Sequence, residues 1–181
     1  MRKVVLLSGG VDSALILARL LRAGGDVLAL CFDYGQPARS EVLASEALAD
    51  YYGVKWCCPS FSVGSGEGWG FDDTTEMNQA SQIVLRNRNA MFLALASAYG
   101  LALYIGAIKD DHEVFQDCRQ GFFDKMGQVL GVTIETPLIK MTKAEVMQEA
   151  RDLGVPLDLC VSCYRGTSCG RCLSCVERLG S

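Results

Sequence analysis

The chain has 181 residues, half of them hydrophobic, which is enough material for one compact α/β core. Its formal net charge of −4 argues against a broad basic surface for nucleic acid and favours a small-molecule substrate. Asp12 interrupts the first apolar run, so we do not expect a secretory signal peptide. We therefore expect a cytoplasmic protein with a single catalytic domain over residues 1–181 and no membrane association.

The N-terminal third alternates apolar runs with helix-forming segments. Runs of Val, Leu and Cys that end in turn residues predict strands, and strong helix formers closed by glycine predict helices. The predicted elements are a strand over 3–7, a helix over 14–23, a strand over 27–32, a helix over 38–52 and a strand over 54–57. Residues 59–75 are rich in Gly, Ser and Asp without periodicity, so we expect a loop that is either a lid or an insertion.

The second half begins with an uncharged segment, residues 89–108, whose length matches a membrane span. We favour a different interpretation, in which Gly100 separates a buried helix from a buried strand of a parallel sheet. Thr142 and Glu145 have the spacing of a capping box, which predicts that a helix begins there. The predicted elements are a helix over 89–99, a strand over 101–107, a helix over 119–130, a strand over 132–135 and a helix from 142 to 153.

This alternation predicts the fold class. Strands and helices of these lengths form an open, mainly parallel sheet with helices on both faces and right-handed crossovers. Ligands of such sheets bind beyond the carboxyl ends of the strands, so we expect the functional site there.

The segment SGGVDS, residues 8–13, follows the first strand at such an end. Its glycines let the backbone approach a ligand, and the free N–H groups at the start of the next helix favour an anion. It has neither the lysine of a Walker loop nor a dinucleotide fingerprint. Asp12 would repel a phosphate unless it binds Mg²⁺ or shapes the loop. The alternative is a plain strand-to-helix turn with an N-cap.

Five of the nine cysteines fall within residues 160–175, and such clustering indicates a metal site in a reducing compartment. Four of them form a C-x5-C-x2-C-x2-C array that could close a tetrahedral zinc site, and an iron–sulfur cluster is the rival. Cys160 could replace Cys169 as a ligand. The cysteines outside the cluster, which we expect to be buried small apolar residues rather than nucleophiles, are Cys31, Cys57, Cys58 and Cys118.

Taken together, these motifs resemble those of the 7-cyano-7-deazaguanine synthases, a family of N-type ATP pyrophosphatases. The resemblance rests on SGGVDS at 8–13, FDYGQ at 32–36, Arg-Asn at 88–89, Asp-Cys-Arg at 117–119 and the terminal cysteines, and it covers nearly the whole chain. Two features depart from the family pattern. The chain is shorter between residues 54 and 86, and the first spacing in the cysteine array is tighter.

The resemblance implies an adenine nucleotide alpha hydrolase-like fold with a small C-terminal zinc knot of four cysteines at about 160–178. It also implies a homodimer that uses ATP, Mg²⁺ and Zn²⁺, and a ligase that forms C–N bonds. The reaction would convert 7-carboxy-7-deazaguanine and ammonia to the nitrile preQ0, through an adenylated carboxylate and an amide. The alternative is a related enzyme that adenylates another carboxylate, thiolates tRNA, or serves deazapurine-based DNA modification, protein modification or phage defence.

The resemblance and the chemistry of pyrophosphate departure together suggest the site residues. The ATP-binding candidates are Leu7, Ser8, Gly9, Gly10, Val11, Asp12, Ser13 and Ala14. The substrate-binding candidates are Tyr34, Gln36, Asn89 and Asp117. The catalytic candidates are Asp12 and Ser13 with three cations, Arg88, Lys109 and Arg119, each of which could instead be a solvated charge or part of a structural ion pair. The zinc candidates are Cys163, Cys169, Cys172 and Cys175.

Overall fold

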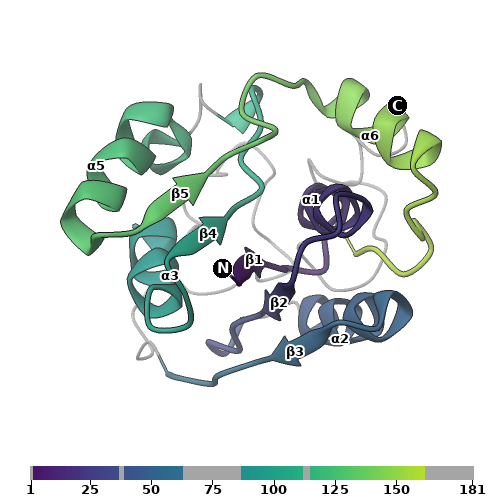
Figure 1. Cartoon of the computed structure of the whole chain (residues 1–181), viewed down its shortest axis with the longest axis horizontal. Coiled ribbons are helices and arrows are strands. Elements are labelled where there is room, and N and C mark those ends of the chain that lie inside the picture. Colours follow the sequence, from purple (N-terminus) through teal and green to yellow (C-terminus); the bar gives the residue numbers. More distant parts are fainter. Residues whose placement is uncertain (1, 37–38, 63–86, 112–114, 162–181) are drawn as a thin grey trace, which may run out of the picture.

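The computed structural model describes residues 2–36, 39–62, 87–111 and 115–161. Its centre is a five-stranded sheet in the order β3-β2-β1-β4-β5 (Figure 1). All pairings between these strands are parallel, which confirms the predicted fold class. The strands are β1 (Lys3–Leu6), β2 (Val27–Leu30), β3 (Lys55–Cys57), β4 (Ala102–Tyr104) and β5 (Thr133–Glu135).

Helices cover both faces of the sheet (Figure 1). The helices are α1 (Val11–Arg22), α2 (Ser40–Tyr52), α3 (Arg88–Ala96), α5 (Gln120–Leu130) and α6 (Lys143–Asp152). One hydrophobic cluster joins α1, α2 and α6 to one face of the sheet, and a second joins α3 and α5 to the other. Alternate residues of β1 enter different clusters, Val5 the first and Val4 the second, which explains why the strand is apolar throughout.

The order of the strands places a crevice beside β1. The chain runs outward from β1 through β2 to β3 and then returns to β4 on the other side of β1. Such a reversal leaves the connections after β1 and β4 on opposite sides of a gap, where doubly wound sheets bind ligands. The glycine-rich turn at residues 8–13 follows β1 and therefore lies at this gap.

The uncharged segment 89–108 is divided as the second interpretation predicts, into α3, a turn and β4. No helix in the described part of the chain is long and apolar enough to cross a membrane. Helix α1 begins three residues earlier than predicted. The other elements are shorter than predicted, and the strands lose residues mainly at the ends that turn toward the crevice. One short element, the 3-10 helix η2 (Gln116–Cys118), was not expected.

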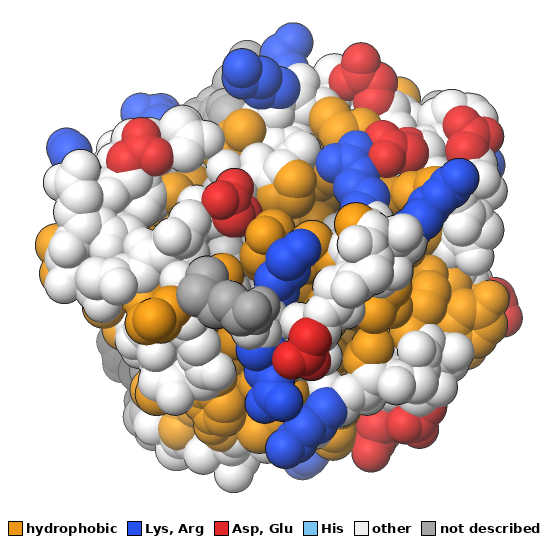
Figure 2. All heavy atoms as spheres, in the orientation of Figure 1, with side chains coloured by type: hydrophobic (Ala, Val, Ile, Leu, Met, Phe, Trp, Pro, Cys, Tyr) orange, Lys and Arg blue, Asp and Glu red, His pale blue; other side chains and the backbone are white. Residues whose placement is uncertain are grey.

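On the face shown in Figure 2, Lys and Arg side chains are interspersed with Asp and Glu side chains and hydrophobic patches. This mixed pattern agrees with the balanced composition and the slightly acidic net charge.

Candidate active site

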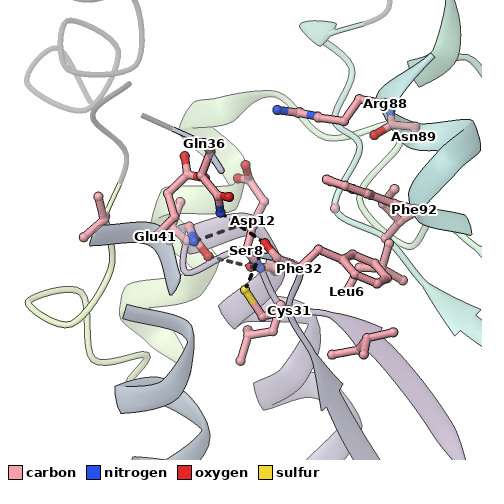
Figure 3. A pocket seen from close by; sticks show the side chains of 18 of the residues that line it. Leu6, Ser8, Asp12, Cys31, Phe32, Gln36, Glu41, Arg88, Asn89 and Phe92 are labelled. Atoms are coloured by element: carbon pink, nitrogen blue, oxygen red, sulfur yellow. Dashed lines mark hydrogen bonds between the residues drawn. The ribbon is translucent and has the colours of Figure 1, made fainter. Parts of the chain in front are cut away.

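A cavity of about 240 Å³ lies at the carboxyl ends of β1, β2 and β4 (Figure 3). The turn at residues 8–13, the loop after β2, and the first turns of α2, α3 and α6 contribute to its lining. The predicted site residues that line it are Leu7, Ser8, Gly10, Val11, Asp12, Ser13, Tyr34, Gln36, Arg88 and Asn89. Motifs that lie far apart in the sequence therefore meet in one cavity.

Hydroxyl groups hold the turn at residues 8–13 in place. The Ser13 hydroxyl donates to the Gly10 carbonyl at 2.9 Å and accepts from the Ser8 backbone N–H at 3.2 Å. Gly10 is the N-cap of α1 and has no side chain to satisfy the first N–H groups of the helix. The turn thus offers backbone donors and the positive end of a helix dipole to an anion in the cavity.

Two glycines bring neighbouring elements against this turn. Gly9 has φ +82°, and a Cβ added there would lie 2.5 Å from the Glu41 carbonyl oxygen in α2. A Cβ on Gly106, in the connection after β4, would lie 3.1 Å from the Asp12 Cβ. Because neither residue has a side chain, α2 and the β4 connection both reach the turn.

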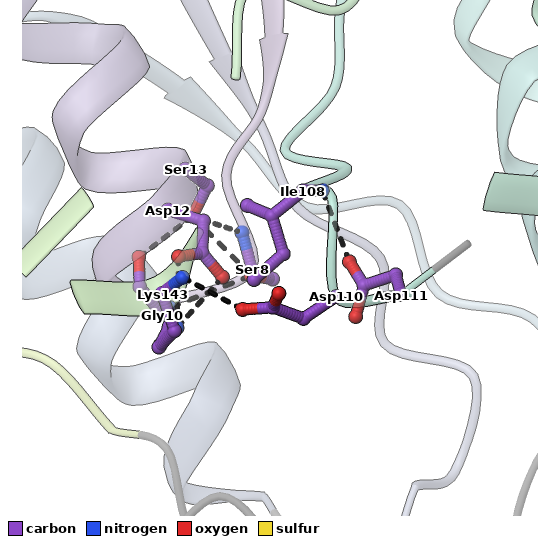
Figure 4. Close-up of polar contacts among 8 residues, drawn as sticks. All are labelled: Ser8, Gly10, Asp12, Ser13, Ile108, Asp110, Asp111 and Lys143. Atoms are coloured by element: carbon purple, nitrogen blue, oxygen red, sulfur yellow. Dashed lines mark hydrogen bonds and ion pairs between the residues drawn. The ribbon is translucent and has the colours of Figure 1, made fainter. Parts of the chain in front are cut away.

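Asp12 forms an ion pair with Lys143, with its two oxygens 2.8 and 3.0 Å from Nζ (Figure 4). Both side chains are at least three-quarters buried. Lys143 is the first residue of α6, and its backbone N–H donates to the Asp110 carboxylate at 2.8 Å. The predicted capping box between Thr142 and Glu145 is present and fixes the start of this helix. A cation is thereby held beside the glycine-rich turn.

Lys143 was not among the predicted site residues. Its position at the start of a predicted helix could have singled it out, because a lysine there is repelled by the positive end of the helix dipole and needs a compensating interaction. The ion pair with Asp12 is that interaction.

A second ion pair joins the helices that carry Asp12 and Lys143. The Arg19 guanidinium of α1 donates to both oxygens of Glu149 in α6, at 2.6 and 2.5 Å. The hydrogen bond from Arg19 holds the pKa of Glu149 below its usual range. Two charge pairs thus connect α1 to α6, one at the cavity and one farther along the helices.

The Gln36 amide is engaged within its own loop. Its Oε1 accepts from the Tyr34 backbone N–H at 3.0 Å, and its Nε2 donates to the Phe32 carbonyl at 3.1 Å. Gln36 is buried and therefore shapes the loop after β2. This loop and α3 together form an aromatic wall, in which the Phe32 and Phe92 rings stack with centroids 4.9 Å apart and the Tyr34 ring is 5.2 Å from Phe92.

Asn89 and Asp117 bind each other. The Asn89 side-chain amide donates to the Asp117 carbonyl at 2.9 Å, and the Asp117 carboxylate accepts from the Asn89 backbone N–H at 3.3 Å. Asp117 thus binds the first turn of α3, where a carboxylate is favourable. Arg88, the first residue of α3, extends into the cavity beside this contact (Figure 3).

Two carboxyl groups in the cavity were not predicted. Burial raises the pKa of Glu41, and the Arg88 guanidinium partly opposes this. Burial also raises the pKa of Asp111, while the hydrogen bond from the Ile108 N–H lowers it and the charge of Asp12 raises it further. Groups whose pKa is displaced by burial within a cleft mark functional-site candidates.

Some predicted residues lie outside the cavity lining. Gly9 packs against α2 and Ala14 is buried in the core, so both support the turn from behind. Lys109 is exposed, and its charge acts on Glu145. Arg119 is exposed at the start of α5. Among the described residues, Arg88 and Lys143 are the cations that line the cavity.

The cysteine predictions are tested only in part. Cys31 and Cys118 are buried as expected, whereas Cys57 and Cys58 are only partly buried. Burial, the largest cause, raises the pKa of the Cys31 and Cys118 thiols to about 12. Such thiols are poor nucleophiles. Cys163, Cys169, Cys172 and Cys175 lie outside the described residues. Within residues 2–161, where described, no cluster of three or more His, Cys, Asp or Glu side chains could hold a metal ion.

A family model described as "Queuosine biosynthesis protein QueC" matches residues 2–181. The chain belongs to this family. It is 35% identical to the 7-cyano-7-deazaguanine synthase of Thermoplasma acidophilum over 204 aligned positions, covering 98% of this chain and 86% of that protein. It is also 35% identical to the synthase of Alteromonas mediterranea, with 97% and 91% covered.

Solved structures support the fold of this QueC family member. A protein of Methanocaldococcus jannaschii described as a predicted subunit of tRNA methyltransferase matches with a TM-score of 0.60 at 18% identity, over 83% of this chain and 74% of its own. The U34-tRNA thiolase NcsA of Methanococcus maripaludis, with its [4Fe-4S] cluster, matches with a TM-score of 0.57 at 22% identity, over 86% and 57%. At these identities the likeness extends to the fold alone.

Proposed function

We propose that this protein converts 7-carboxy-7-deazaguanine, ammonia and ATP to 7-cyano-7-deazaguanine, with release of AMP and pyrophosphate. Membership of the QueC family and the names of its relatives support synthesis of 7-cyano-7-deazaguanine, and the substrates are those that the sequence resemblance implies. The observation in the structure that supports it best is the cavity in which the glycine-rich turn, the Asp12–Lys143 pair and Arg88 meet beside an aromatic wall. Such a cavity suits a nucleotide and a planar ring together.

The turn would receive a leaving group. A carboxylate is a poor electrophile because its leaving group would be oxide. Attack of the substrate carboxylate on the α-phosphorus of ATP breaks the bond to the α,β-bridging oxygen, and pyrophosphate leaves with the negative charge. Backbone N–H groups at the start of α1 and the Lys143 ammonium would bind that charge as it develops. Mg²⁺, when bound, would neutralise phosphate oxygens, and the Asp12 and Asp111 carboxylates are oxygen ligands that could hold it.

The remaining steps need no nucleophile from the protein. Ammonia displaces AMP from the acyl adenylate and gives the amide. The amide oxygen then attacks a second ATP, and loss of AMP with two protons leaves the nitrile. The protein therefore acts by positioning the reactants and neutralising charge. In this scheme Asn89, Asp117 and Gln36 are positioning residues, because their side chains bind the first turn of α3 or the loop after β2.

Three further parts of the proposal depend on the sequence and the family. We infer a single catalytic domain, a homodimer in the cytoplasm, and a structural zinc ion on Cys163, Cys169, Cys172 and Cys175. The spacing of these cysteines supports the zinc ion. Metal analysis of the purified protein tests it, with about one zinc per chain expected and loss of zinc in Cys172→Ser. An iron–sulfur chromophore would contradict it.

The activity test uses ATP, Mg²⁺, ammonium and 7-carboxy-7-deazaguanine, and follows both pyrophosphate and the nitrile by mass spectrometry. Asp12→Asn should lower the rate by about 100-fold or more, because it removes the charge that holds Lys143 in place and could bind Mg²⁺. Asp50→Asn, an exposed site in α2, is the matched control. Pyrophosphate without nitrile would mean adenylation of another acceptor, and neither product would refute the proposal.

A further inference from the structure

Glu41 lines the cavity, but the reaction as proposed assigns it no task. It belongs to the first turn of α2 and faces Arg88, which enters from α3 on the opposite side (Figure 3). Within the described residues, the Glu41 carboxylate feels the charge of Arg88 but receives no hydrogen bond. Glu41 is partly buried. A partly buried carboxylate without donors is unfavourable, and a ligand that supplies donors would relieve this cost.

The neighbouring groups restrict what that ligand is. Tyr34 and Phe92 form part of the aromatic wall, and the Arg88 guanidinium carbon lies 5.9 Å from the centre of the Phe92 ring. Tyr34 also hydrogen-bonds to Arg88, which fixes the guanidinium near the wall. The cavity thus combines a flat apolar surface with an acceptor on one side and a donor on the other. A planar ring with donors and an acceptor along its edge is complementary to these groups.

A guanine-type ring carries this pattern. Its N1–H and 2-amino group are adjacent donors that a carboxylate accepts in parallel, and its O6 is an acceptor suited to a guanidinium. We infer that Glu41 determines specificity by accepting hydrogen bonds from N1–H and the 2-amino group, while Arg88 binds O6. This inference rests on the proposed function, which supplies a 7-deazaguanine as substrate.

ATP contains another pair of adjacent donors, the ribose hydroxyl groups, and the two ligands predict different kinetics. If Glu41 binds the deazaguanine, its loss raises KM for that substrate and leaves KM for ATP nearly unchanged. If it binds ribose, KM for ATP rises instead. Steady-state kinetics in each substrate separates the two.

The experiment compares the wild type with Glu41→Gln and with Glu46→Gln, an exposed glutamate on the same helix. Each protein is assayed with 7-carboxy-7-deazaguanine and with the analogue that lacks the 2-amino group. The wild type should use the analogue about 10- to 100-fold less efficiently, the size of one good bidentate contact. Glu41→Gln should raise KM for the natural substrate by a similar factor and reduce the discrimination to a few-fold. Glu46→Gln should match the wild type.

The outcomes are distinguishable from failure of the proposed function. An unchanged discrimination ratio in Glu41→Gln, or a rise in KM for ATP alone, would overturn the inference while the activity stands. If the wild type makes neither pyrophosphate nor nitrile, the proposed function fails. Equilibrium dialysis with 7-deazaguanine and 7-deazahypoxanthine then tests the contact without catalysis. Binding that favours 7-deazaguanine in the wild type but not in Glu41→Gln would support it, and equal binding of both rings would overturn it.

Discussion

Gly9→Ala should destabilise the protein, because it places a methyl group where α2 meets the glycine-rich turn. The added Cβ would lie 2.5 Å from the Glu41 carbonyl oxygen and 2.9 Å from the Ala44 Cβ. Both atoms belong to a helix and can move away only with its backbone. The φ of +82° adds a penalty of about 1–2 kcal/mol for an L-residue. Overpacking typically costs about 1–3 kcal/mol, so we expect a total loss of about 2–5 kcal/mol.

Urea denaturation followed by circular dichroism measures this loss, and Gly10→Ala is the matched control. Gly10 has φ −84° and ψ 160°, which any residue adopts, and its added Cβ would have no neighbour closer than 3.5 Å. We expect Gly10→Ala to change the free energy of unfolding by less than about 1 kcal/mol. If Gly9→Ala is as stable as the wild type, or if both variants lose the same amount, the account of how α2 reaches the turn is wrong.

Two further predictions concern α6, which carries Lys143. Glu149→Gln should lower the free energy of unfolding at pH 7 by about 1 kcal/mol, since it weakens the pairing with Arg19. The pKa of Glu149 is lowered in the folded protein, so this contribution is present above the usual glutamate pKa and disappears as the pH falls through the lowered value. The free energies of unfolding of wild type and variant should therefore converge as the pH falls. A difference that stays constant with pH would contradict the pairing of Glu149 with Arg19. Thr142→Ala should lower the free energy of unfolding by about 1 kcal/mol, because it removes the capping box with Glu145. It should also raise KM for ATP, because α6 carries Lys143. A rise in stability would contradict the role of the capping box.

Local signals in the sequence predicted most of the fold. Val-rich and Leu-rich runs, glycine helix ends and the capping box indicated β1, β2, α2, α5 and α6 because each depends on neighbouring residues. Gly100 also indicated the split of residues 89–108 into a helix and a strand. The structure explains the glycine, because a Cβ there would lie 2.8 Å from a methyl group of Val4. The η2 helix carried no comparable signal.

The site was predicted less completely, because its contacts are not local. Lys143 meets Asp12 across 131 positions, and only the packing of α6 on α1 brings them together. In the sequence, nothing distinguishes Glu41 from an exposed glutamate on a helix surface. Its place in the cavity depends on the close approach of α2 to Gly9. Gln36 shows the reverse case, since a motif identified the residue but not that its own loop engages the amide.

In the proposed reaction the substrate carboxylate attacks the α-phosphorus of ATP at the glycine-rich turn. The most direct measurement uses 7-carboxy-7-deazaguanine with ¹⁸O in both carboxylate oxygens, and locates the label by mass spectrometry after full conversion to the nitrile. Each of the two AMP molecules formed per nitrile should then carry one ¹⁸O. Unlabelled AMP, or label in inorganic phosphate with ADP as the nucleotide product, would contradict it.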